Sequence, residues 1–228
     1  MKGFYYNRIF ALFILFCFTP AQAYILPPSF YFQTWATQNK TPQTILIKQE
    51  RDLISQGAVT QTIPETVKIK RSGLYKWSSD VPGLEEMKIL GKTKATVGSP
   101  QSQRVVPLQN ILTPIEVMVA YNQAGTIESI IKQIGIDITQ TKLELVQKIK
   151  EIRIGDPKGN RIYVSPDNNT LDAMVFQGKL YLLKYNQEKF SLYPSEIEVY
   201  ENETLKERVR IKSFMTNAKI SDAEFEVK

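Results

Sequence analysis

The last third of the chain decides the fold. It contains RIYVSPDNNTLDAMVFQGKLYLLKYN over residues 161–186 and YPSEIEVYENETLKERVRIKSF over residues 193–214. Three turn signals divide it, namely Pro166-Asp167-Asn168-Asn169, Gln177-Gly178 and Glu201-Asn202-Glu203. Proline presets φ, while Asp, Asn and Gly tolerate the left-handed backbone that tight turns require. The segments between these turns are therefore predicted to be β-strands.

Apolar and charged residues alternate within these segments. The apolar phase comprises Ile197, Val199, Val209 and Ile211. The charged phase comprises Glu196, Glu198, Arg208, Arg210 and Lys212, which we assign to a solvated face. A period of two with one charged face is typical of an antiparallel sheet that has water on one side. The alternation leaves two interpretations of the apolar face, because it can pack on a filled core or line a cavity.

The first 23 residues have the features of a secretory signal peptide. Lys2 and Arg8 form a basic start, residues 9–18 form an apolar run, and Ala21-Gln22-Ala23 is a small-x-small cleavage site. The run is shorter than a bilayer-spanning helix of about 20 residues. We therefore predict cleavage before Tyr24, with an uncleaved membrane anchor as the alternative.

Cleavage would leave 205 residues, which fits one domain over residues 24–228. The chain has no His, and its single Cys, Cys17, lies within the signal. Disulfides are therefore not expected to stabilise the mature protein. Removing Lys2 and Arg8 lowers the formal net charge from +6 to +4, which suits an anionic membrane surface or an acidic partner. This charge is too weak and dispersed to predict nucleic-acid binding.

Upstream of residue 110 the pattern predicts further strands. We expect them over residues 44–53, 59–77 and 87–97, with an interruption at Arg71-Ser72-Gly73. Residues 24–40 are rich in aromatic side chains and are expected to cover the sheet as an extended strip or a short helix. Residues 142–154 have an ambiguous period, and we favour a strand because the C-terminal strands need a partner.

Two central segments have helical periodicity. Residues 110–122 contain apolar residues at helical spacing, and residues 126–135 contain an isoleucine stripe, with Thr126 as the expected N-cap and Gly135 as the expected C′ residue. Helices this short are marginal in water and must pack on the sheet. The predicted fold is therefore α+β: a curled, mostly antiparallel half-barrel, with short helices as a plug or lid on its concave face.

Catalytic signatures are missing from the sequence. Without His or Cys, the mature chain lacks the usual general base, the thiol nucleophile and most zinc ligands. We find no nucleophile elbow, phosphate-binding loop or dinucleotide fingerprint. Asp167-Asn168-Asn169 lacks the remainder of a calcium-loop pattern and is interpreted as a plain turn. We therefore predict no enzyme activity, no cofactor and no metal site.

Three motifs resemble a known family. They are residues 69–77 (IKRSGLYKW), residues 159–167 together with residues 193–200 (GNRIYVSPD and YPSEIEVY), and residues 217–225 (NAKISDAEF). These motifs resemble periplasmic carriers of outer-membrane lipoproteins and the wider lipoprotein-localisation (LolA-like) superfamily, over about half of the mature chain. Two features depart from the family pattern: Pro27-Pro28 replaces the start of a longer first helix, and Ser72 replaces a proline.

The resemblance implies a non-enzymatic, monomeric periplasmic carrier that shields acyl chains of a lipoprotein or lipid between an inner-membrane donor and an outer-membrane acceptor. It also implies that Arg71 latches the lid, because a guanidinium can bridge several helix carbonyls. The expected cavity residues are Ile69, Tyr75, Trp77, Tyr163, Ile197 and Val199 on the wall, with Met118 and Ile131 on the lid. The alternatives are a solvated Arg71 and a solid-cored envelope interaction module without a lipid ligand.

Overall fold

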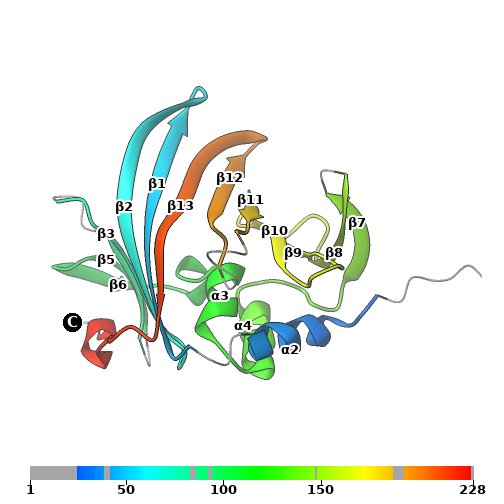
Figure 1. Cartoon of the computed structure of the whole chain (residues 1–228), viewed down its shortest axis with the longest axis horizontal. Helices are drawn as coiled ribbons and strands as arrows, with labels where there is room; N and C mark the ends of the chain where they lie inside the picture. The colour runs from blue at the N-terminus through cyan, green and yellow to red at the C-terminus, as the bar shows by residue number, and fades with distance from the viewer. Residues whose placement is uncertain are drawn as a thin grey trace, which may run out of the picture.

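The computed structural model describes residues 25–38, 42–82, 86–91, 94–146, 148–186 and 193–226, so the predicted signal peptide lies outside the described residues. Its centre is one antiparallel sheet of 13 strands that curls without closing into a barrel (Figure 1). The strands of the first half are β1 (Thr44–Ser55), β2 (Ala58–Lys70), β3 (Leu74–Ser79), β4 (Met87–Leu90), β5 (Ala95–Ser99) and β6 (Ser102–Val105). Those of the second half are β7 (Thr141–Val146), β8 (Ile149–Gly155), β9 (Arg161–Val164), β10 (Leu171–Phe176), β11 (Lys179–Lys184), β12 (Glu196–Glu201) and β13 (Thr204–Thr216).

The order of the strands explains why helices fill the concave side. From β1 the chain builds outward to the edge strand β6, and from the other edge strand, β7, it returns to β13, which pairs with β1. The connection between the two edges carries a 3-10 turn, η1 (Leu108–Asn110), and two helices, α3 (Pro114–Ala120) and α4 (Ala124–Gln133). These helices lie inside the curl, beside the N-terminal helix α2 (Pro28–Gln38) (Figure 1). The predicted α+β half-barrel with a helical plug is therefore confirmed.

The predicted turns join consecutive strands. Gln177 and Gly178 have φ values of 51° and 78°, and Asn202 and Glu203 have values of 48° and 62°. Two successive positive φ angles match the right-handed twist of a β-hairpin. Asn169, at the end of the predicted turn that joins β9 to β10, also has a positive φ of 59°.

Two strand predictions need correction. Residues 142–154 form a hairpin of two strands, β7 and β8, and residues 87–97 contain the whole of β4 and the start of β5. Local periodicity did not locate either reversal, because tertiary pairing and not residue pattern selects where these short strands turn. The interruption expected at Arg71-Ser72-Gly73 is confirmed as the turn between β2 and β3.

Helix α3 is shorter than its predicted segment at both ends, and α4 begins and ends two residues before its predicted segment. Gln123 is the N-cap of α4, so the assignment of Thr126 to that role is wrong; the Thr126 hydroxyl instead lies 3.5 Å from Gln123 Oε1 within the first turn. Gly135 has a φ of +91° and follows the C-cap Ile134, which confirms it as the C′ residue. The Gly135 and Ile136 amides donate to the Lys132 and Ile131 carbonyls, at 3.0 and 3.2 Å, as in a Schellman motif.

One hydrophobic cluster joins the helices to the concave face of the sheet. Ile45, Ile47 and Ile69 contribute from the strands, and Phe32 and Ile127 from the helices. Each of these five side chains is 0% exposed. None of the described helices is long and apolar enough to cross a membrane.

Candidate functional site

The helical plug presents apolar side chains to the concave face. Helix α2 buries Phe32 and Trp35, and α4 buries Ile127 and Ile131. Hydrogen bonds between the plug region and the sheet include Trp35 Nε1 to the Asn169 carbonyl at 2.7 Å. Others are Asn160 Nδ2 to the Ile134 carbonyl at 3.3 Å and Gln177 Nε2 to the Gln109 carbonyl at 3.0 Å. The remaining contact between plug and sheet is apolar packing within the buried cluster.

Seven of the eight predicted cavity residues lie at this interface. Six of them belong to the buried hydrophobic cluster: Ile69, Tyr75, Trp77, Ile131, Ile197 and Val199. Met118, on α3, is half-buried and packs against the same cluster. In the described structure these side chains contact one another and the helices, so the plug occupies the concave face.

Tyr163 lies on the opposite face of the sheet. Its neighbours Ile162 and Val164 belong to the hydrophobic cluster, so alternation along β9 turns Tyr163 outward. Arg161 Nε donates to its hydroxyl at 2.6 Å, and its backbone partner on β8 is Arg153. This placement differs from the prediction, and we do not retain Tyr163 as a residue of the concave wall.

Arg71 occupies the turn between β2 and β3 and is only 5% exposed. The interpretation of Arg71 as a solvated charge at a strand end is therefore wrong. Burial lowers the pKa of its guanidinium to about 10. Its neighbour Gly73 has a φ of +90°, and a Cβ there would lie 2.6 Å from Cε1 of Tyr121, the C-cap of α3. The Arg71 turn thus packs against the end of a plug helix.

A polar and aromatic belt, which the sequence analysis missed, crosses the concave face near α3. We define it as Gln49, Arg51, Glu65, Tyr75, Trp77, Lys88 and Glu116. Gln49 Nε2 donates to Glu65 at 2.6 Å, and Arg51 forms an ion pair with Glu65, whose side chain is fully buried. The Arg51 guanidinium and the Lys88 ammonium lie 5.2 and 5.4 Å from the centre of the Trp77 ring. These distances are typical of cation–π contacts.

Glu116 brings a further carboxylate to this belt. Its Oε2 accepts from the Thr113 backbone amide at 2.8 Å, in a capping box at the start of α3. Burial raises the pKa of Glu116, and burial together with the negative charge of Glu116 raises that of Tyr75. The sequence does carry a signal for the belt, because Glu65 shares the strand phase of Val67 and Ile69 and must point inward with them.

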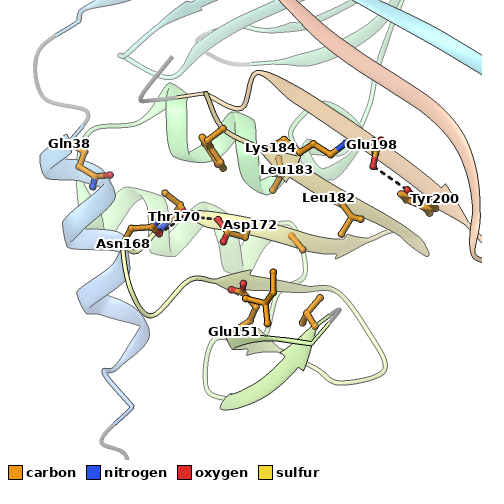
Figure 2. Close-up of a pocket in the computed structure, with 14 residues that line it drawn as sticks. Gln38, Glu151, Asn168, Thr170, Asp172, Leu182, Leu183, Lys184, Glu198 and Tyr200 are labelled. Atoms are coloured by element: carbon orange, nitrogen blue, oxygen red, sulfur yellow. Dashed lines mark hydrogen bonds and ion pairs between the residues drawn. The ribbon is translucent and has the colours of Figure 1, made fainter. Parts of the chain in front are cut away.

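The convex face has two described pockets. The larger, of about 790 Å³, lies along β8, β10, β11 and β12 (Figure 2). The smaller, of about 460 Å³, lies beside Lys68 and Lys76. Among the described residues, neither pocket is lined by a predicted cavity residue.

Glu198 borders the larger pocket. It was expected to be solvated, but it is 8% exposed and pairs with Lys184 at 2.9 Å and Arg208 at 3.3 Å. The expectation was wrong because neighbouring long side chains cover this part of the face.

Comparison with known proteins identifies the fold. No protein-family model matches the chain, and no curated protein sequence matches it. Among solved structures, a LolA superfamily protein from Nitrosomonas europaea is similar with a TM-score of 0.57 and 10% identity, over 87% of this chain and 97% of that one. The chain has a LolA-like fold.

Two further structures have this LolA-like fold at comparable similarity. The proposed outer membrane lipoprotein-sorting protein domain from Vibrio parahaemolyticus has a TM-score of 0.58 and 11% identity, over 86% of this chain and 95% of that one. A DUF1329 family protein from Desulfovibrio piger has a TM-score of 0.57 and 14% identity, over 88% and 98%. At these identities the similarity concerns the backbone architecture, and site residues must be argued from this chain alone.

Proposed function

We propose that this chain is a non-enzymatic periplasmic carrier, which shields the acyl chains of a lipoprotein or lipid between an inner-membrane donor and an outer-membrane acceptor. The observation that supports this most directly is the apolar plug, in which α2 and α4 bury Phe32, Trp35, Ile127 and Ile131 against the concave face. Such contacts are non-directional, so acyl chains can replace the helices on the same surface.

The energetics of acyl-chain burial favour this exchange. Each buried CH₂ contributes about 0.8 kcal/mol, so one long acyl chain contributes on the order of 10 kcal/mol. That amount is enough to offset the loss of the apolar contacts that a few helix side chains make. Shielding therefore requires a surface and a movable cover, and no catalytic group.

Burial and packing support the assignment of a wall and a latch within this proposal. Ile69, Tyr75, Trp77, Ile197 and Val199 would contact the acyl chains, and Met118 and Ile131 would move with the plug. Arg71 would hold α3 over the wall, because its turn packs against Tyr121 at the end of that helix. The charged side chains of the belt would then face the polar part of the cargo.

The proposed carrier must be exported to the periplasm. Residues 1–23 would direct the chain through the inner membrane, and residues 24–228 would act as one monomeric domain in the periplasm. The resemblance in fold to the Vibrio parahaemolyticus domain supports a role in lipoprotein sorting.

A solid-cored interaction module is the second candidate function. The described helices fill the concave face, and both edge strands carry exposed apolar residues: Val105 on β6 is 67% exposed and Leu145 on β7 is 71% exposed. Open edges with apolar residues are suited to pairing with another chain. In this case the plug would stay closed and the sheet edges would bind the partner.

Quenching of Trp77 by brominated acyl chains separates the two candidates. The chain has two tryptophans, Trp35 on α2 and Trp77 on β3. If acyl chains enter the concave face, dibromostearate should quench wild-type emission, while stearate at the same concentration should not. The Trp77→Phe variant should lose most of this quenching. Absence of bromine-dependent quenching in folded protein would favour the interaction module.

Replacing Trp77 by Ala provides a second measurement. In a carrier, Trp77→Ala should weaken acyl-probe binding more than it lowers stability. In a permanently filled core the same change should cost about 3–5 kcal/mol of unfolding free energy and leave no binding to lose.

A further inference from the structure

The pocket of about 790 Å³ on the convex face is chemically unlike the concave surface. Glu151, Leu182 and Glu198 lie in the strand phase opposite to the buried cluster, and Gln38 at the end of α2 borders the pocket. None of the proposed acyl-chain residues lines it. Apolar side chains, including Ala173 and Leu182, line its middle, and Val146 and Ile149 stand at one rim. Figure 2 shows the carboxyl groups of Glu151, on β8, and Asp172, on β10, at one end, and Lys184 with Glu198 at the other. Strand β9 lies between β8 and β10 in the sheet.

Glu151 is a buried carboxyl group without a partner. It is 3% exposed, lines the pocket, and its Oε2 has no hydrogen-bond partner. Buried charges in proteins are normally paired, since an isolated one loses its hydration without compensation. Burial, together with the negative charges of Asp172 and Asp167, raises the pKa of Glu151 to about 7. The Glu151 site therefore lacks a positive charge.

Two cations of this face, Lys184 and Arg153, are paired with other carboxylates. Lys184 pairs with Glu196 at 2.7 Å and with Glu198 at 2.9 Å. Arg153, two residues beyond Glu151 and on the same face of β8, pairs with Glu144 at 2.8 Å. Asp172 accepts a hydrogen bond from the Thr170 hydroxyl, which leaves its negative charge in place. Within the described part of the chain, neither Glu151 nor Asp172 has an ion-pair partner.

We propose that this pocket binds a ligand with an ammonium group on an apolar chain, the ammonium lying between Glu151 and Asp172 and the chain lying along Ala173 and Leu182. An ammonium group supplies both the charge and the hydrogen-bond donors that the Glu151 carboxyl lacks. A metal ion fits less well, because the described residues contain no group of three or more His, Cys, Asp or Glu side chains that could hold one. An anion would meet carboxylates at both ends.

A matched set of six-carbon probes tests the charge requirement. Hexylamine, hexanol and hexanoate share one alkyl chain and differ in charge, and binding to protein expressed from the full chain is measured by calorimetry at pH 8. Hexylamine should bind saturably, and the other two at least tenfold more weakly. At pH 6 hexylamine should bind about tenfold more weakly, because a group with a pKa of about 7 is then about nine-tenths protonated.

Isosteric variants test the named residues. Glu151→Gln and Asp172→Asn should each weaken hexylamine binding at least tenfold, whereas Glu128→Gln, at a partly exposed position on α4 outside the pocket, should have no effect. Unfolding curves establish that each variant is folded, and Glu151→Gln should also lose the pH dependence of binding. Equal binding of hexylamine and hexanol, or unchanged hexylamine binding by folded Glu151→Gln, would overturn the proposal.

Vesicles identify the source of the ammonium group. Vesicles that contain a long-chain amine, such as stearylamine, should displace hexylamine if the natural ligand is a membrane-borne amine, and phosphatidylglycerol vesicles serve as the control. If neither displaces it while the variant results hold, the ligand is a soluble amine. Failure of the acyl-chain quenching experiment would leave this convex site unaffected.

Discussion

Arg71 is the single residue on which the proposed gating depends. It is buried beside a glycine turn that the Tyr121 ring covers, and its lowered pKa of about 10 reflects the loss of water around the guanidinium. A buried charge of this kind is a poor source of stability, since desolvation offsets much of its attraction to partners. A role in holding the plug explains the position better than stabilisation does.

Replacing Arg71 should therefore change cargo retention more than folding. We expect Arg71→Leu to change the unfolding free energy by no more than about 1 kcal/mol, since the apolar side chain removes the desolvation cost of the buried guanidinium. The purified variant should carry several-fold more lipid per protein, measured by mass spectrometry. Arg71→Lys should also retain lipid, because an ammonium lacks the planar fork of donors. Equal lipid loading in all three proteins would remove Arg71 from the mechanism.

The raised pKa of Glu151 makes the stability of the protein depend on pH. Its folded-state pKa of about 7 lies above the ordinary value of 4.5, so the folded state binds more protons between these values. Stability that depends on Glu151 is therefore highest below about pH 4.5 and is lost as pH rises through 7. At pH 8 Glu151→Gln should be more stable than wild type by about 1–3 kcal/mol, and at pH 4.5 the two should be similar. Urea unfolding at both pH values measures the difference; equal stability at both would show that Glu151 titrates normally.

The C-terminal tail fastens the first half of the sheet. After β13, Asn217 donates its backbone amide to the Thr44 carbonyl at 2.7 Å, and its Oδ1 accepts from the Gln43 amide at 3.1 Å. The 3-10 turn η2 (Asp222–Phe225) then places Glu224 against Lys68 and buries Phe225 to 2% exposure. These contacts give a structural reason for the tail motif noted in the sequence.

Burial of Phe225 should matter more than the ion pairs of the tail. Phe225→Ala should lower the unfolding free energy by about 3 kcal/mol, because it leaves a cavity under η2. Glu224→Gln should cost less than about 1 kcal/mol, since partly exposed ion pairs contribute little. Chemical denaturation of both variants makes the comparison. If Glu224→Gln proved the more damaging, electrostatic attachment of the tail would be the correct account.

Local interactions define where the helical segment of the plug begins and ends. The capping box of Glu116 and Thr113 fixes the start of α3, and the positive φ of Gly135 ends α4 before the chain enters β7. With both ends defined locally, the helices can cross from one sheet edge to the other without strong polar ties to the strands. Such a segment is suited to move as a unit.

For the molecule as a whole, export is the first requirement of the proposed carrier. We predict that the mature protein begins at Tyr24 and is recovered in the soluble periplasmic fraction, because Ala21-Gln22-Ala23 provides the cleavage site. N-terminal sequencing after expression of the full chain checks this. Residues 1–23 retained in a membrane fraction would indicate an uncleaved anchor instead.

The sequence by itself determined the fold class of this protein. Alternation, turn residues and two short helical stripes predicted a curled antiparallel sheet with a helical plug. These features succeed because strand period, turn backbone and helix caps are local properties of a few consecutive residues. The role of Gly135, for example, depends only on its own φ and its neighbours.

Only the tertiary structure decided how the faces are used. Residues 161–164 are apolar in both phases apart from Arg161, so the pattern could not assign Tyr163 to a face until the pairing of β9 with β8 and β10 was known. The belt around Glu65 and the unpaired Glu151 likewise depend on strands far apart in the sequence. The pairing of β1 with β13 joins residues more than 150 positions apart, and no local signal specifies such a contact.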